Sequence, residues 1–335
     1  MKFPFYSPLR VAEAVGRGHP DRIADQLADK AVDLILEQDP LASIGIEVLL
    51  SQEQITIAGE VDCQTIPQLE AGLRKVLLEV GIHQPIPFRF HLHTPSVEIS
   101  RAVLDGAFAD QAIVTGFACR EHPSYLPLPQ ALALEAIEIL EKINGLGKDG
   151  KLLCFVENET IKELRISWQV EENGPSVEEL RGVFFSKLSH LNKQSMIVFH
   201  PFFKGGIEAD TGLTGRKLVA TGYGSEIPHG GGALSGKDGG KVDRLGAYLA
   251  RLLAKSIVKT EGREWAFVTL SFIFGEQQNH SFDLLTEKGA EKRVFKATKA
   301  EIFSLLELQK PRYYETAVKG QFSGDFPWEN LILLP

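Results

Sequence analysis

The residues best suited to bind a charged ligand are concentrated between positions 204 and 244. Of the 31 glycines in the chain, 12 lie in this stretch, interleaved with basic residues. Glycine-rich backbone can approach an anion closely and turn its N–H groups toward it. The basic residues that stand among the glycines include Arg216, Lys217, Lys237, Lys241 and Arg244. This combination is typical of a polyphosphate site, whereas the alternative, surface turns with solvated charges, requires far fewer glycines.

Three carboxylates, Asp210, Asp238 and Asp243, stand among these cations. Because phosphate repels carboxylate, we expect some of them to hold a divalent metal or a substrate ammonium group. Asp238 also argues against a P-loop at residues 231–237, since a P-loop needs Ser or Thr at that position for magnesium. The HGGG run at 229–232 resembles an esterase oxyanion loop, but the chain lacks the G-x-S-x-G elbow that accompanies it.

A second candidate centre precedes the first predicted helix, in Gly18-His19-Pro20-Asp21. Proline suits the first helical position, and the helix dipole favours Asp21 in the first turn. The rigid proline would hold His19 at the mouth of the helix. These residues are as consistent with helix capping as with a site for a metal and a proton.

Two glutamates occupy a predicted hairpin. Residues 44–50 and 55–61 are β-rich runs joined by the polar sequence SQEQ. With SQEQ as the loop, Glu47 faces position 58 and Glu60 faces position 45, so both carboxylates lie on one face. Glu47 stands in an apolar strand and needs a cation, such as a monovalent ion or an ammonium group, unless that strand face is exposed.

The elements that position these residues are predicted from apolar spacing and capping signals. Helices are expected at 22–37, 66–80, 129–143, 176–191 and 241–258, with capping boxes that begin at Ser176 and Thr298. Further strands are expected at 85–93, 152–157, 161–168, 195–199 and 265–274. Strand pairs alternate with helices, which predicts an α+β fold with sheets covered by helices rather than a doubly wound parallel sheet.

The composition excludes several classes of protein. The 335 residues carry 36 Lys+Arg and 44 Asp+Glu, a formal net charge of −8, which argues against partners such as nucleic acid or an anionic membrane. The 3 cysteines are widely spaced, which favours neither a disulfide framework nor a zinc site and suits a reducing cytoplasm. No apolar run is long enough for a signal peptide or a membrane span. We therefore expect a cytoplasmic protein.

Taken together, the motifs resemble the S-adenosylmethionine synthetase family, from about residue 13 to residue 329. They are GHPDRIADQLAD, ILEQDP, the strand end at Glu60, ADQ at 109–111, GLTGRK, HGGGALSGKDGGKVDR and ETAVKGQFSGDFPWE, in the order found in the family. The resemblance implies a methionine adenosyltransferase. Such an enzyme makes S-adenosylmethionine, phosphate and diphosphate from ATP, L-methionine and water, with Mg²⁺ and K⁺ as cofactors.

The resemblance also implies three similar α+β domains related by pseudo-threefold symmetry. The central domain would comprise 18–100 and 206–245, the N-terminal domain 1–17 and 121–205, and the C-terminal domain 101–120 and 246–335. It further implies a homodimer or a dimer of dimers, with active sites at the interface between two copies.

Site residues follow from the same resemblance. The catalytic residues would be His19 at the C5′–O5′ bond of ATP, Lys151, and Arg216, which would act in cleavage of the triphosphate. The ATP and triphosphate contacts would be Asp110, Asp149, Arg216, Lys217, Lys237 and Lys241. The methionine contacts would be Glu60, Asp210 and Lys241. The metal ligands would be Asp21 and Asp243 for Mg²⁺ and Glu47 for K⁺.

Several positions depart from the family pattern. The family sequence S-E-G-H-P-D-K becomes GRGHPDR at 16–22, which reverses the charge at Arg17 and places Arg22 where the family has lysine. The loop between Pro95 and Asp110 is shorter and has no clear counterpart of the methionine-contacting glutamine. The adenine-stacking phenylalanine is missing, with Phe202 or Phe203 as substitutes, and Phe274 replaces a smaller isoleucine. The alternatives are a divergent adenosyltransferase for another thioether or nucleotide, or a non-catalytic nucleotide-binding relative.

Overall fold

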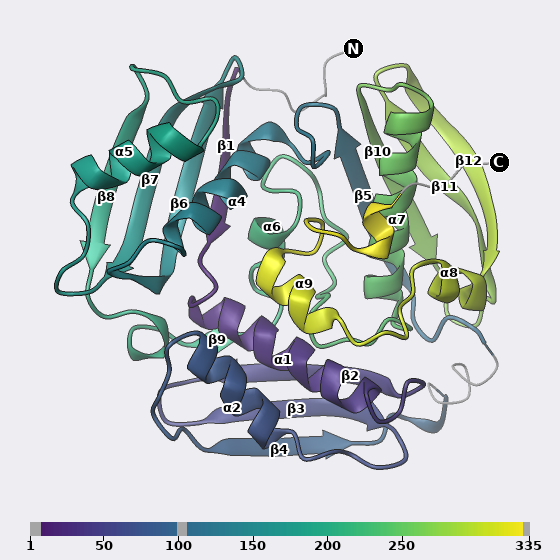
Figure 1. The fold of residues 1–335 in the computed structure, drawn as a ribbon. Helices are drawn as coiled ribbons and strands as arrows, with labels where there is room; N and C mark the ends of the chain where they lie inside the picture. Colours follow the sequence, from purple (N-terminus) through teal and green to yellow (C-terminus); the bar gives the residue numbers. More distant parts are fainter. Residues whose placement is uncertain (1–7, 99–105, 331–335) are drawn as a thin grey trace.

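The computed structural model describes residues 8–98 and 106–330, and its strands form three four-stranded sheets (Figure 1). The first sheet, in the order β1-β6-β7-β8, contains β1 (Leu9–Val15), β6 (Leu146–Glu157), β7 (Thr160–Val170) and β8 (Met196–Phe202). The second, β4-β3-β2-β9, contains β2 (Ser43–Leu50), β3 (Ile55–Asp62), β4 (Phe88–His93) and β9 (Gly212–Leu213). The third, β12-β11-β10-β5, contains β5 (Ala112–Cys119), β10 (Trp265–Phe272), β11 (Gln278–Thr286) and β12 (Gly289–Thr298).

Helices pack on each of these sheets, so the predicted α+β class is confirmed. They are α1 (Pro20–Leu36), α2 (Glu70–Glu79), α4 (Leu128–Leu140), α5 (Val177–Lys187), α6 (Leu218–Thr221), α7 (Val242–Thr260), α8 (Lys299–Leu305) and α9 (Tyr313–Lys319). Helix α4 packs on β1 and β6, α1 on β2, and α7 on β5 and β10. The pseudo-threefold relation and the three domain divisions stay predictions.

Local signals explain where several elements begin. His19 is the N-cap of α1 and Pro20 its first residue, as the sequence predicts. The capping boxes at Ser176 and Thr298 are both present. In the hairpin, Glu47 pairs with Ala58 and Glu60 with Gly45, so the predicted register is confirmed. Helix α2 begins only at Glu70, later than predicted.

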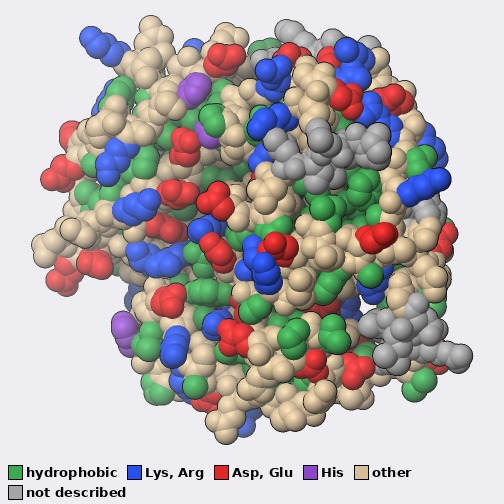
Figure 2. Space-filling view, turned by 45° about the vertical axis from the view of Figure 1, so that its right-hand side comes forward, with side chains coloured by type: hydrophobic (Ala, Val, Ile, Leu, Met, Phe, Trp, Pro, Cys, Tyr) green, Lys and Arg blue, Asp and Glu red, His purple; other side chains and the backbone are tan. Residues whose placement is uncertain are grey.

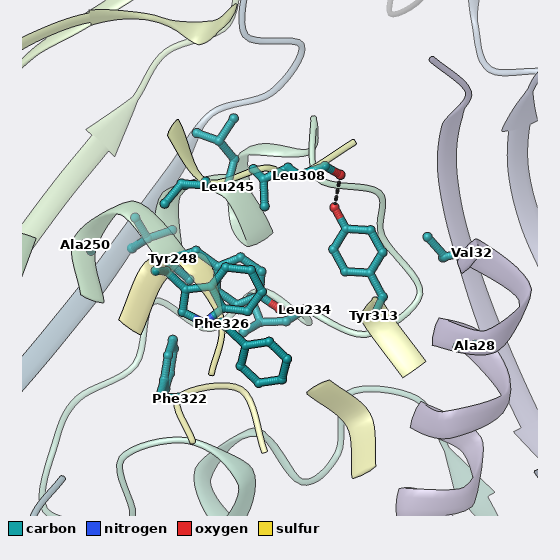
Figure 3. Close-up of a cluster of buried hydrophobic side chains, with 14 of the residues drawn as sticks. Ala28, Val32, Leu234, Leu245, Tyr248, Ala250, Leu308, Tyr313, Phe322 and Phe326 are labelled. Atoms are coloured by element: carbon teal, nitrogen blue, oxygen red, sulfur yellow. Dashed lines mark hydrogen bonds between the residues drawn. The ribbon is translucent and has the colours of Figure 1, made fainter. Parts of the chain in front are cut away.

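The C-terminal segment packs between α1 and α7 (Figure 3). Tyr313 lies beside Val32 of α1, and its hydroxyl donates a hydrogen bond to the carbonyl of Leu308. On α7, the ring of Tyr248 stacks on that of Trp328, with centroids 3.7 Å apart. Apolar burial therefore joins the start of α7, which carries the KVDR sequence, to α1 through the C-terminal segment.

Side chains of both charges lie on the surface of the molecule. Figure 2 shows acidic and basic side chains interspersed over one face. Within residues 8–98 and 106–330, no helix combines the length and the apolar character that crossing a bilayer would need.

Candidate active site

Four aspartates form a row along one buried face of α1. They are spaced by four residues, which places them on the same side of a helix. Each accepts a backbone N–H from a segment about 190 to 280 residues away in sequence. Asp21 accepts from Leu213, Asp25 from Gly215, Asp29 from Gly236, and Asp33 from Tyr313, at distances of 2.9, 2.8, 2.8 and 2.9 Å. Helix α1 thus anchors the loops that carry Arg216, Lys217 and Lys237. This anchoring role was not predicted from the sequence. The pattern that could have indicated it is the recurrence of aspartate every four residues in a predicted helix.

Asp21 lies at the centre of the first of two groups of predicted site residues. Its carboxylate is fully buried and lies 2.5 Å from Lys217 Nζ and 3.2 Å from Arg216 Nε. These cations and the Leu213 N–H lower the pKa of Asp21 against the opposing effect of burial. Arg216 is half-exposed, so its guanidinium can also face a ligand.

His19 stands beside this carboxylate at the start of α1. Its Nδ1 accepts a hydrogen bond from the backbone N–H of Asp21 at 3.2 Å. Burial, reinforced by the positive charges of Lys217 and Lys151, lowers the pKa of His19 to about 4. His19 is therefore neutral at pH 7, and because Nδ1 is an acceptor, its proton is on Nε2.

Strand β6 and the loop after β8 complete this group. Burial raises the pKa of Asp149, whose carboxylate accepts the N–H of Gly206 at 2.6 Å. Lys151 and Asp210 both influence the titration of His19 and of Asp149, which places them in the same group. The first cluster comprises His19, Asp21, Asp149, Lys151, Asp210, Arg216 and Lys217.

The other six predicted residues line one cavity of about 570 Å³. This second cluster comprises Glu47, Glu60, Asp110, Lys237, Lys241 and Asp243. Lys237 Nζ lies 2.5 Å from a carboxylate oxygen of Asp243. Glu47 lies on the exposed face of β2, the second of the two situations considered for it from the sequence. A cavity of this volume is typical of a small-molecule site.

The two clusters lie toward opposite ends of α1. His19 caps the first turn of this 17-residue helix, and Leu36, its last residue, lines the cavity of the second cluster. A helix of that length spans roughly 24 Å. Among the described residues that line the cavity, none belongs to the first cluster. A single chain therefore presents the thirteen predicted residues as two separate groups.

The carboxylates predicted to bind Mg²⁺ are divided between these clusters. In residues 8–98 and 106–330, no three side chains of the types that ligate metals come together as one site. Asp21 and Asp243 are each paired with a lysine instead, at 2.5 Å in both cases. One carboxylate per cluster still fits Mg²⁺, because this ion is commonly held by one or two carboxylates together with substrate phosphates.

Two positions that depart from the family pattern have structural partners. Arg22 points into the interior and donates to the carbonyls of Val15, Ala317 and Val318, each at 2.8 Å. It therefore binds the end of α9 rather than facing the first cluster. The backbone N–H of Arg17 donates to Glu141 at 2.8 Å, and its guanidinium lies 4.0 Å from the same carboxylate. Glu141 thus offsets the reversed charge.

The aromatic positions remain available for a ligand. Phe203 is 70% exposed just beyond β8, whereas Phe202 is half-buried. Phe274 is 49% exposed after β10. The shortened loop between Pro95 and Asp110 includes residues 99–105, which lie outside the described part of the chain.

Asp25 gives a stability prediction that depends on pH. Burial, with Asp29 and Asp21 nearby, raises the pKa of Asp25 to about 7, above the value of about 3.9 in an unfolded chain. The folded state therefore binds this proton more tightly, and stability falls as pH rises from about 4 to about 7. Asn at this position keeps an acceptor for Gly215 without ionising. We expect Asp25→Asn to raise the melting temperature relative to wild type at pH 8 and to lose this advantage by pH 5.

Differential scanning fluorimetry across this pH range measures the effect. The exposed Asp325 provides a matched control, Asp325→Asn. If the difference in melting temperature between Asp25→Asn and wild type stays constant from pH 5 to pH 8, the raised pKa of the buried Asp25 is contradicted.

Comparison with known proteins matches two family models to this chain. The N-terminal domain of S-adenosylmethionine synthetase matches residues 7–107, and the C-terminal domain of the same enzyme matches residues 204–330. A protein of Aquifex aeolicus named S-adenosylmethionine synthase is 32% identical over 366 residues, covering 97% of each chain. Proteins with the same name from Zymomonas mobilis and Hyphomonas neptunium are 33% and 31% identical, covering 97% and 98% of each chain.

The chain belongs to the S-adenosylmethionine synthetase family. The resemblance drawn from its motifs is thereby confirmed. Membership extends over nearly the whole length of the chain, including residues 108–203, which lie between the two matched domains and contain β5 to β8. The two clusters can therefore be considered as parts of an S-adenosylmethionine synthetase.

Proposed function

We propose that the protein is an ATP-dependent methionine adenosyltransferase that converts ATP, L-methionine and water to S-adenosylmethionine, phosphate and diphosphate. The observation that carries this proposal is family membership across the whole chain, since the relatives named above share one enzyme name. The two groups of cations and carboxylates supply the chemistry that such a reaction needs. Three free thiols at Cys63, Cys119 and Cys154 suit a cytoplasmic location.

His19 stabilises the leaving group in this proposal. The thioether sulfur attacks C5′ of ATP, the C5′–O5′ bond breaks, and negative charge builds on O5′ of the triphosphate. A neutral imidazole with its proton on Nε2 donates a hydrogen bond to that oxygen. With a pKa of about 4, His19 acts as a positioned donor rather than as an imidazolium acid.

The basic residues of both clusters bind the triphosphate. Lys217 and Lys237 are held in place by Asp21 and Asp243 and exchange these carboxylates for phosphate oxygens when the ligand enters. The freed carboxylates would hold Mg²⁺, which offsets phosphate charge when bound. Arg216 and Lys241 add further contacts, with Arg216 serving the later cleavage to phosphate and diphosphate.

Methionine and the nucleoside contact the remaining predicted residues. Glu60 and Asp210 pair with the α-ammonium group of methionine, and Lys241 with its carboxylate. Lys151, Asp110 and Asp149 surround the reacting centre and the nucleoside. Glu47, which lines the cavity of the second cluster, would hold K⁺.

Each complete active site combines the first cluster of one copy with the second cluster of another. The separation of the clusters along α1 supports this arrangement, because it divides the predicted methionine contacts: Asp210 lies with His19 in the first cluster, whereas Glu60 and Lys241 line the cavity of the second. Exposed apolar residues beside the clusters also support it: Leu49 and Leu213 of the second sheet are 46% and 37% exposed. Burial of this face between two copies would remove that surface from water.

A product assay tests the activity. Purified protein with ATP, methionine, Mg²⁺ and K⁺ should form S-adenosylmethionine together with equal amounts of phosphate and diphosphate, detected by mass spectrometry and phosphate release. A panel of other thioethers and nucleotides distinguishes a divergent adenosyltransferase. Binding of ATP without any product would favour the non-catalytic alternative and refute the proposed activity.

A further inference from the structure

The cavity of the second cluster continues beyond the six predicted residues toward α8. There it is lined by Lys299, the first residue of α8, together with Lys237 and Lys241. The capping box fixes this end of the helix, since the hydroxyl of Thr298 accepts the N–H of Glu301 at 3.2 Å. Lys299 is thus a third lysine at a defined place in the cavity.

Lys299 lacks a carboxylate partner in the described part of the chain. Its Nζ donates to the carbonyl of Ala107 at 3.1 Å, which uses one of its three N–H groups. Within residues 8–98 and 106–330, neither Lys299 nor Lys241 forms an ion pair at 4.0 Å or less, whereas Lys237 pairs with Asp243. Two N–H groups of Lys299 therefore remain for a ligand.

The electrostatics around Lys299 favour an incoming anion. Burial lowers the pKa of Lys299 and the like charge of Lys241 lowers it further, while Asp238 opposes both. Asp238 is already satisfied by the N–H groups of Ile44 and Gly240, both at 2.6 Å. A partly buried ammonium group beside a second one is costly unless a negative charge approaches.

Asp238 attracts Lys299 through space, but no carboxylate of the cavity forms an ion pair with Lys299 in the described part of the chain. Asp243 is taken by Lys237, and Asp238 by backbone N–H groups. Glu47, Glu60 and Asp110 line the same cavity from β2, β3 and the segment before β5, but no ion pair joins any of these described side chains to Lys241 or Lys299.

Glycine keeps the space between the lysines open. A Cβ on Gly240 would lie 2.9 Å from a carboxylate oxygen of Asp238 and 4.0 Å from Lys299 Nζ. The backbone next to both lysines therefore carries no side chain, and a ligand can approach them from the cavity.

We propose that Lys299 binds the polyphosphate of the substrate and product, as a further contact beside Lys237 and Lys241. This inference rests on the proposed function. Two neighbouring ammonium groups, neither of them in an ion pair of 4.0 Å or less among the described residues, match a ligand with several negative charges. A polyphosphate provides these charges, whereas the single carboxylate of methionine would leave one ammonium group uncompensated.

Isothermal titration of the full chain with inorganic tripolyphosphate and Mg²⁺ tests this contact. Lys299→Met keeps most of the length of the side chain and removes its charge. We expect the Kd for tripolyphosphate to rise at least about tenfold, as for loss of a hydrogen bond to a charged group. The KM for ATP should rise as well, with the KM for methionine unchanged. Lys296→Met, at an exposed position of β12, is the matched control.

Lys299→Arg separates binding from folding, because it keeps the positive charge at the start of α8. Its Kd should lie closer to that of wild type than the Kd of Lys299→Met. Equal tripolyphosphate affinities for Lys299→Met and Lys296→Met would overturn the inference while leaving the proposed function standing, and so would a rise confined to the KM for methionine. A wild-type protein that neither binds tripolyphosphate nor forms S-adenosylmethionine would instead refute the proposed function itself.

Discussion

Replacing His19 by asparagine should lower kcat by a factor of about 10² to 10³, the range for loss of one donor to a developing oxyanion. Asparagine is a favourable N-cap residue, and its side-chain oxygen can accept the Asp21 N–H that His19 Nδ1 accepts now. The start of α1 is therefore retained, and only the Nε2 donor is lost. Because that contact strengthens as charge builds on O5′, the KM for ATP should change by no more than about twofold.

Steady-state kinetics of the His19→Asn protein measure this effect. His200→Asn, at an exposed position of β8, is the control. The pH dependence gives an independent test. The pKa of about 4 predicts that kcat does not follow ionisation of His19 between pH 5 and pH 8. A loss of ATP affinity as large as the loss of kcat would contradict the role assigned to this imidazole.

Replacing Arg244 by methionine should lower the free energy of unfolding by about 3–5 kcal/mol, as expected when one partner of a buried ion pair is removed. Arg244 and Asp29 are both fully buried, and their side chains form a bidentate pair at 2.7 and 2.8 Å. Arg244 also donates to the carbonyl of Lys237 at 2.7 Å. Its removal leaves the carboxylate of Asp29 without its cation and loosens the loop that presents Lys237.

Urea denaturation followed by circular dichroism measures this loss. The double variant Arg244→Met/Asp29→Asn should recover part of it, because the uncompensated carboxylate is then gone. Arg165→Met removes the pair that the exposed Arg165 forms with the half-buried Glu163 and serves as the control, with a loss below about 1 kcal/mol expected. An Arg244→Met protein as stable as this control would show that the buried pair does not stabilise the junction of α1 and α7.

Local signals were sufficient to predict much of the fold. The Pro20 start of α1, the pairing of Glu47 with Ala58 and the capping boxes at Ser176 and Thr298 all depend on neighbouring residues. The β11–β12 hairpin was not predicted, because β12 is largely polar and exposed, and the apolar alternation in β11 is short, with Phe282 and Leu284 as its buried apolar residues. Whether such a segment forms a strand depends on its contacts with the rest of the sheet rather than on its local sequence.

The chemistry of the candidate site was also predicted from the sequence, but its arrangement was not. Glycine density identified the loops that carry Arg216 and Lys237. The contacts that fix these loops join Asp25 to Gly215 and Asp29 to Gly236, far apart in sequence, so no local pattern could place them. The division of the predicted residues into two clusters likewise follows only from packing along α1.

Intersubunit complementation tests the central claim, that each active site joins the first cluster of one copy to the second cluster of another. His19→Asn impairs the first cluster and Lys241→Met the second, so each homodimer should be nearly inactive. A heterodimer of the two variants, purified through two different tags, has one site with both substitutions and one with neither. It should therefore form S-adenosylmethionine at about half the wild-type rate. A heterodimer as inactive as its parents would contradict the claim, because it would place both clusters of each active site in one chain.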